Sequence, residues 1–109
     1  MNTFNYYMII LEEDEYYCPS SPNHNEGTLS NRITKLVNAY CKLFKNTFII
    51  RSDKDSKYWI EKITELKCNK NTGFLILDIE IVNYKNIIAG LIGQSKWNWI
   101  DEERQLRFL

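Results

Sequence analysis

The amino-acid sequence predicts a single domain of the α+β class. The chain has 109 residues, which is enough for one hydrophobic core and too few for two domains. Its hydrophobic share of 44% and its formal net charge of +0 are typical of a folded protein rather than a disordered one. Short apolar runs alternate with segments of helical periodicity, so strands and helices should follow one another along the chain.

The first predicted element is a central strand at residues 4–11, FNYYMIIL, because this run is short and rich in strand-forming residues. Residues 12–28 contain both prolines, Pro19 and Pro22, together with several Ser and Asn residues, which are typical of a loop. Long loops are often functional or mobile. We therefore expect a mobile loop at 12–28.

The clearest helical pattern covers residues 29–44. Thr28 or Ser30 can cap its N-terminus, because either side chain offers an oxygen to free backbone amides. The sequence therefore predicts one long helix, whose apolar stripe repeats at spacings of three and four: Leu29, Ile33, Leu36, Val37, Tyr40, Leu43 and Phe44.

The second half of the chain predicts three further elements. Residues 46–51, NTFIIR, form a strand, residues 57–66, KYWIEKITEL, form a shorter helix, and residues 74–81, FLILDIEI, form another strand. The Trp-containing tail at 83–109 gives a weaker signal and fits a short terminal helix or a docked segment.

Alternating strands and helices of this number have two usual arrangements, a doubly wound parallel sheet and a split βαβ sandwich. The long first loop and the small number of strands favour the second. We therefore predict a ferredoxin-like βαβ-βαβ sandwich over residues 1–109, with an antiparallel or mixed sheet and two helices on one face.

Four motifs occur in a familiar order: YYMIILEE at 6–13, NTFIIRSD at 46–53, GFLILDIE at 73–80 and GLIGQSKWNWI at 90–100. Together they resemble the small CRISPR-associated adaptation nuclease-like family (the second Cas protein) and its stand-alone SinR-like relatives. Each motif is common by itself, so the resemblance depends on the ordered set, which covers nearly the whole chain.

The resemblance implies a catalytic aspartate at the end of the first strand, where two subunits together hold a metal. Glu12 occupies that position here, and its side chain is one methylene longer. Mg²⁺ requires near-ideal octahedral geometry. We therefore expect no catalytic residue beyond the weak candidate Glu12, no metal and no cofactor, and Mg²⁺ enters only under the alternative of a nuclease.

The candidate binding residues form an acidic, an aromatic and a basic group. The acidic run can hold a cation, mimic phosphates or simply solvate the loop. The basic residues Arg32, Lys35, Arg51, Lys54 and Lys57 can form a local patch, with Tyr16, Tyr17 and Tyr58 as stacking surfaces for single-stranded nucleic acid, or a soluble helix face. The tryptophans can pack in the core or in an interface. The residues are Glu12, Glu13, Asp14, Glu15, Tyr16, Tyr17, Arg32, Lys35, Arg51, Trp97 and Trp99.

The cysteines Cys18, Cys41 and Cys68 lie far apart, and with His24 they lack the spacing of a structural zinc site. Their odd number argues against a disulfide framework, so we expect reduced thiols in a cytoplasmic protein. No run approaches the length of a membrane span, so we expect no membrane partner.

The sequence therefore predicts a non-catalytic binding protein built on a ferredoxin-like homodimer. We expect it to act on a protein or nucleic-acid partner, as a prokaryotic or phage factor of defence or counter-defence such as an anti-CRISPR protein. The alternative is a metal-dependent endonuclease of the family it resembles. Apolar surface on the last strand and in the tail predicts that residues 78–100 supply much of the dimer interface.

Overall fold

A computed structural model describes residues 4–15, 27–79 and 93–106 of the chain. The described elements are β1 (Asn5–Leu11), α1 (Leu29–Thr34), β2 (Ala39–Phe44), β3 (Thr47–Ser52), α2 (Ser56–Leu66), β4 (Phe74–Ile79) and α4 (Gln94–Leu106). The predicted α+β class is confirmed. No helix in the described ranges is long and apolar enough to cross a membrane.

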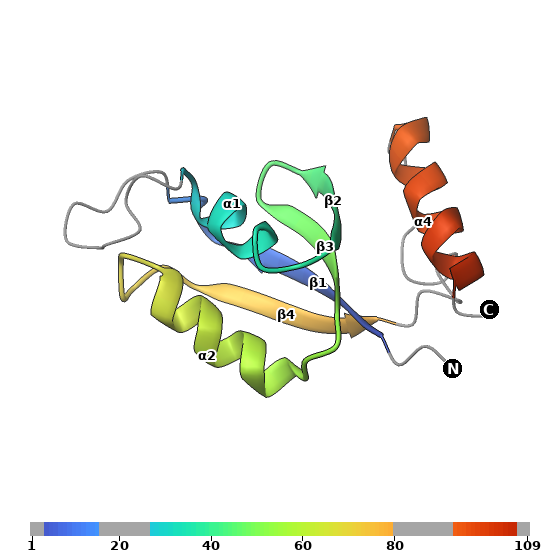
Figure 1. The fold of residues 1–109 in the computed structure, drawn as a ribbon. Helices are drawn as coiled ribbons and strands as arrows, with labels where there is room; N and C mark the ends of the chain where they lie inside the picture. Colours follow the sequence, from blue (N-terminus) through green and yellow to red (C-terminus); the bar gives the residue numbers. More distant parts are fainter. Residues whose placement is uncertain (1–3, 16–26, 80–92, 107–109) are drawn as a thin grey trace.

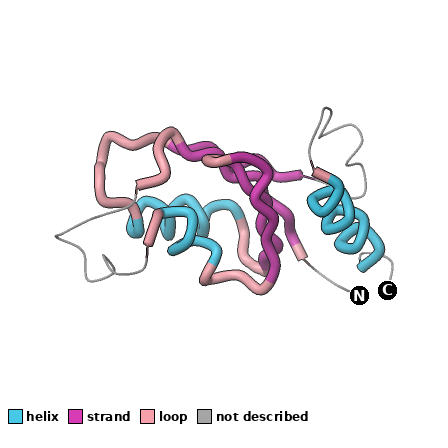
Figure 2. Tube along the Cα trace, turned by 90° about the horizontal axis from the view of Figure 1, so that it is seen from above, coloured by secondary structure: helices cyan, strands magenta, loops and turns pink. Residues whose placement is uncertain are grey.

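The four strands form one sheet in the order β2-β3-β1-β4, and every neighbouring pair is antiparallel. β1 therefore lies inside the sheet, as its apolar sequence predicts. Figures 1 and 2 show α1 and α2 close together against the strands, with α4 apart from them near the other end of the sheet. This arrangement is compatible with a ferredoxin-like sandwich.

One face of the sheet packs against α1 and α2, and we call it the first face. Successive strand residues point to opposite faces, and Tyr7, Ile9 and Leu11 of β1 point to this one. They share a buried cluster with Phe48 and Ile50 of β3, Leu29 and Ile33 of α1, and Trp59 and Ile63 of α2. The indole of Trp59 also donates a hydrogen bond from Nε1 to Ser52 Oγ at 2.8 Å, so its one polar atom is satisfied.

The opposite, second face is covered at one end by α4. Ile100 of α4 is fully buried against Tyr6, Cys41, Leu43, Ile49 and Ile79, with Trp97 and Trp99 partly buried around this cluster. Lys96 Nζ also donates a hydrogen bond to the carbonyl oxygen of Leu43 at 2.8 Å. The tail therefore contributes a helix to the core of its own subunit.

The predicted helix at 29–44 is wrong in its second half. α1 ends at Thr34, and residues 39–44 form β2, which pairs with β3 after the two-residue connection 45–46. Cys41 and Leu43 are buried while Lys42 and Phe44 are exposed, which is the alternation of a strand. The apolar residues in this stretch fit both the spacing of a helix and the alternation of a strand. Pairing with β3 decides in favour of the strand.

The other predicted elements are largely confirmed. Thr28 caps α1 by accepting a hydrogen bond from the Asn31 amide, and Asp55 caps α2 in the same way through Tyr58. The last strand ends at Ile79 within the described residues, and residues 80–92 lie outside them. Residues 16–26 of the predicted loop, which include His24, also lie outside, so the structure does not test the mobility of that loop.

The prediction of reduced thiols is wrong for Cys68, which is disulfide-bonded to a partner outside the described residues. Cys41 is free and buried, and burial raises the pKa of its thiol. An odd number of cysteines still permits one disulfide with one thiol left over.

Candidate functional site: a cleft beside the start of α2

The first candidate site is the acidic run at the end of β1. Glu12 is exposed, and it ties the end of β1 to the start of β4: its amide donates to the Gly73 carbonyl oxygen at 2.9 Å, and its Oε1 accepts from the Gly73 amide at 3.0 Å. Glu13 is exposed. Of these two carboxylates, Glu12 therefore has a structural role.

Asp14 and Glu15 serve as acceptors for backbone amides. Asp14 holds the first turn of α1, because its two oxygens accept from the amide and the hydroxyl of Ser30, both at 2.7 Å. Glu15 is only 7% exposed and accepts from the amides of Cys68 at 2.9 Å and Asn69 at 2.7 Å. Its carboxylate thereby closes the turn that follows α2.

The acidic run therefore joins β1 to three other parts of the fold. Hydrogen bonds to a carboxylate are among the stronger ones in proteins, so these contacts fix the side chains of Asp14 and Glu15 in place. Within residues 4–15, 27–79 and 93–106, no three His, Cys, Asp or Glu side chains are grouped so that they could hold a metal ion.

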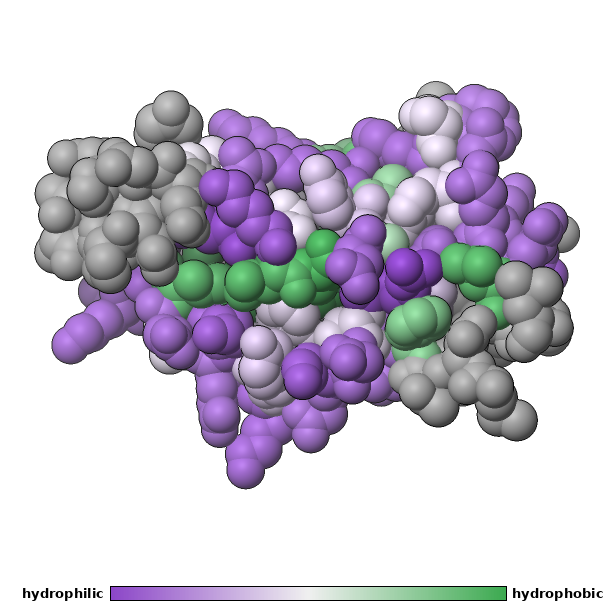
Figure 3. Space-filling view, in the orientation of Figure 1, coloured by the Kyte–Doolittle hydropathy of each residue, from purple (hydrophilic) through white to green (hydrophobic). Residues whose placement is uncertain are grey.

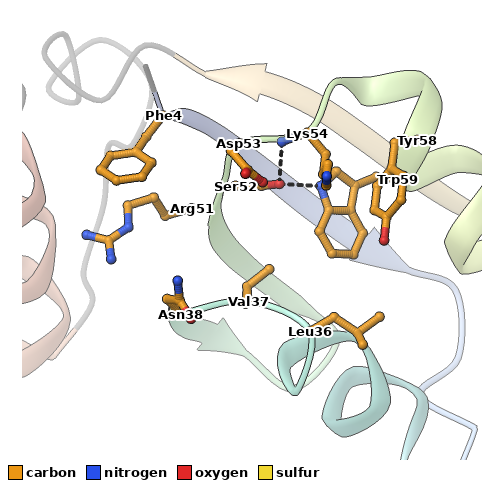
Figure 4. Close-up of a pocket in the computed structure, with 10 residues that line it drawn as sticks. All are labelled: Phe4, Leu36, Val37, Asn38, Arg51, Ser52, Asp53, Lys54, Tyr58 and Trp59. Atoms are coloured by element: carbon orange, nitrogen blue, oxygen red, sulfur yellow. Dashed lines mark hydrogen bonds between the residues drawn. The ribbon is translucent and has the colours of Figure 1, made fainter. Parts of the chain in front are cut away.

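A cleft of about 140 Å³ lies beside the start of α2, and we call it the Asn38 cleft (Figure 4). One wall is the connection from α1 to β2, and the other wall is the connection from β3 to α2 with the first turn of that helix. Its lining residues are Phe4, Leu36, Val37, Asn38, Arg51, Ser52, Asp53, Lys54, Tyr58 and Trp59. Pockets for whole small molecules usually measure about 300–1,000 Å³. This cleft therefore suits one protruding group of a larger partner.

The cleft combines a cation, Lys54, an aromatic ring, Tyr58, and an exposed apolar side chain, Leu36. Lys54 Nζ lies 5.7 Å from the ring centroid of Tyr58, and both Lys54 and Asn38 are exposed. Ser52 has little capacity left to bind a ligand, because its Oγ already accepts hydrogen bonds from Trp59 Nε1 and from the Lys54 amide. Leu36 is 48% exposed at the other wall. Figure 3 shows apolar side chains along the border between α1 and α2 on this face of the molecule.

Arg51 lies at one end of the cleft, and its guanidinium points toward α4 (Figure 4). Its Nη1 donates to Glu103 at 3.1 and 3.2 Å, and its guanidinium carbon lies 4.6 Å from the Phe4 ring centroid. Burial raises the pKa of the Glu103 carboxyl, although the charge of Arg51 lowers it. Arg51 therefore joins β3 to α4 and is not free to bind a phosphate.

Of the predicted basic and aromatic group, the cleft brings together Arg51, Lys54 and Tyr58. Arg32 is 1% exposed and does not line the cleft, and Lys35 is exposed on α1. Tyr16 and Tyr17 lie outside the described residues. Trp97 and Trp99 pack against their own sheet.

Asn38, which lies beside Val37 on one wall of the cleft, was not recognised from the sequence as a site residue (Figure 4). It appeared to be a polar residue in the middle of a long helix. Asn is a frequent turn residue, so Asn38 directly before the alternating residues 39–44 was the signal that a connection begins there.

A second, apolar groove of about 320 Å³ is lined by Ile10, Glu12, Gly73, Phe74 and Leu75. It lies at the end of β1 and the start of β4. Leu75 is 61% exposed and Leu77, two residues along the same strand face, is 46% exposed. α4 therefore leaves this part of the second face open.

No family model, curated protein or solved structure matches this chain. The functional argument therefore depends on the geometry of the acidic run, the Asn38 cleft and the exposed part of β4.

Proposed function

We propose that this chain is a non-catalytic binding protein with a ferredoxin-like fold, whose protein or nucleic-acid partner docks at the Asn38 cleft. In this proposal it belongs with the CRISPR-associated and SinR-like proteins that its motifs resemble. It acts in prokaryotic or phage defence or counter-defence by occupying a partner rather than by cleaving one.

One observation carries the preference for binding over cleavage. Asp14 and Glu15, which follow the candidate position Glu12, are both held by hydrogen bonds to other parts of the chain. A metal-dependent nuclease needs carboxylates that are free to hold the ion and to position the attacking water. Glu12 supplies one carboxylate, and that one also accepts from Gly73.

A cleavage assay tests this preference. We expect no cleavage of labelled single- or double-stranded DNA or RNA above background with Mg²⁺ or Mn²⁺. The same substrates are incubated with wild type and Glu12→Ala, after circular dichroism has shown that both are folded. Cleavage by wild type that disappears in Glu12→Ala would make the endonuclease the leading function, whereas equal cleavage by both proteins indicates a contaminant.

The cleft itself is tested by a substitution at Lys54. Fluorescence anisotropy with a labelled single-stranded oligonucleotide at low salt should show binding that weakens as salt rises, because phosphate contacts release counterions. Lys54→Glu should weaken it, and Lys70→Glu, an exposed lysine in the turn before β4, should not. If wild type does not bind at low salt, the partner of the cleft is a protein.

We propose further that the protein is a homodimer joined through β4. Within the described residues β4 pairs only with β1, so its other edge is open and carries the exposed Leu75 and Leu77. Open apolar edges commonly pair with another chain. In this proposal the interface lies mainly on β4 rather than across residues 78–100, because α4 packs on its own sheet.

Light scattering checks the dimer. Wild type should have about twice the mass of 13.0 kDa at micromolar concentration. Leu77→Glu should give a monomer, whereas Leu36→Glu, at a similarly exposed leucine in the Asn38 cleft, should leave the dimer intact. A monomeric wild type at high concentration would contradict the proposal.

A further inference from the structure

The side chain of Arg32 is buried without a partner. Arg32 lies in the last turn of α1, beside Leu29 and Ile33 of the first-face core, and is 1% exposed. Its three guanidinium nitrogens, Nε, Nη1 and Nη2, have no hydrogen-bond partner. A guanidinium keeps its charge at any ordinary pH. Burying such a charge alone costs several kcal/mol, so a counter-ion is required.

The two acidic residues that contact the first turn of α1, Asp14 and Glu15, already accept other hydrogen bonds. Asp14 holds Ser30 on the first turn of the same helix, and Glu15 holds the turn after α2. The ion pairs within 4.0 Å among the described residues are Arg51 with Glu103 and Lys62 with Glu65. Neither pair includes Arg32.

We propose that Arg32 is the binding residue for a small carboxylate ligand. The planar guanidinium presents parallel donors that match the two oxygens of a carboxylate. Arg32 is the one buried cation in the described part of the chain, and Lys35, one turn further along α1, is exposed. A single guanidinium neutralises one negative charge, so a monocarboxylate is matched, whereas a dianionic phosphate would leave a buried negative charge.

Ligand entry requires a movement of the Arg32 side chain, because its nitrogens have almost no surface of their own in this structure. The free protein therefore stores an unfavourable buried charge, and binding of the carboxylate relieves it. This predicts that the ligand stabilises the fold.

Thermal unfolding of the full chain with sodium acetate as the probe tests the site. Against sodium chloride at equal ionic strength, acetate at ten times its dissociation constant should raise the Tm of wild type by about 5 °C. Arg32→Met, which keeps the length and removes the charge, should show no acetate effect and should be at least as stable as wild type without acetate. Lys35→Met on the same helix should respond as wild type does.

Two outcomes would overturn the proposal. If Arg32→Met is less stable than wild type and acetate has no effect on wild type, Arg32 has a partner within the chain. If acetate stabilises all three proteins equally, its effect is a general salt effect.

A second measurement does not depend on the folding of a variant. The Nε–H signal of Arg32 in an ¹H–¹⁵N spectrum of wild type should shift and saturate with acetate while the signals of the other three arginines stay in place. An Arg32 signal that does not move would also overturn the proposal.

Discussion

The two faces of the sheet are covered to different extents. α1 and α2 bury five residues of the first face in one cluster of nine, whereas α4 alone covers one end of the second face. The uncovered end exposes Leu75 and Leu77. The first face is thus covered by two helices of the same chain. The second face keeps exposed apolar side chains to which a partner can bind.

Each side of the sheet also holds one arginine, Arg51 half-buried beside α4 and Arg32 fully buried on α1, and the two differ in their partners. Arg51 pairs with Glu103 of α4, a residue 52 positions away in the sequence. Arg32 on the first face has no such pair among the described residues. The chain itself supplies a counter-ion for Arg51, and the proposed carboxylate ligand would supply one for Arg32.

The largest difference between the two faces should appear when one buried isoleucine on each face is replaced by alanine. Ile100→Ala should lower the free energy of unfolding by about 2–4 kcal/mol, because a fully buried side chain leaves a cavity. The loss should be concentrated in α4, since this helix contacts the sheet through few residues. Hydrogen exchange measured by mass spectrometry should show faster exchange in residues 94–106 than in residues 56–66.

The matched control is Ile63→Ala on α2, at an equally buried isoleucine of the first face. It should accelerate exchange across the sheet and both helices of that face, because they form one cluster. If Ile100→Ala accelerates exchange uniformly along the chain, the two faces unfold as one cooperative unit and the comparison fails.

A smaller effect concerns pH and the Arg51–Glu103 pair. Burial raises the pKa of Glu103 in the folded protein above its unfolded value. A group of this kind contributes stability that is complete below the unfolded pKa and is lost as pH rises through the folded pKa. The stability of wild type relative to Glu103→Gln should therefore fall as pH rises above about 4, where an unfolded glutamate loses its proton. This change should be smaller than that of Ile100→Ala, because the charge of Arg51 opposes the effect of burial.

Chemical unfolding at several pH values measures this difference. Glu61→Gln, an exposed residue of α2, is the control and should keep a constant offset from wild type. A relative stability of wild type that rises with pH would show that the attraction of Arg51 outweighs the burial of Glu103.

Several elements of the fold could be predicted from residues that lie close together in the sequence. The aromatic and β-branched run at 4–11 gave β1, and the apolar spacing at 57–66 gave α2. The capping role of Thr28, one of two candidates named from the sequence, was also visible, because a cap acts over three residues. These features depend on local backbone preferences, which neighbouring side chains express directly.

The candidate site could be predicted less well. Glu12 to Glu15 were recognised as a group, but the hydrogen bonds of Asp14 to Ser30 and of Glu15 to Cys68 and Asn69 join segments 16 to 54 residues apart. The Asn38 cleft was missed because it exists only where α1 ends early. Lys54 and Tyr58 were visible as residues, but not as its opposite wall.

The sequence by itself therefore determined an α+β chain with a central apolar strand, an amphipathic second helix and an acidic segment after the first strand. Only the tertiary structure decided that residues 39–44 are a strand, that the tail covers the second face, and that Arg51 has a counter-ion whereas Arg32 has none. The physical reason is that strand pairing, burial and charge pairing are settled between residues far apart in the sequence. Local preferences leave those choices open.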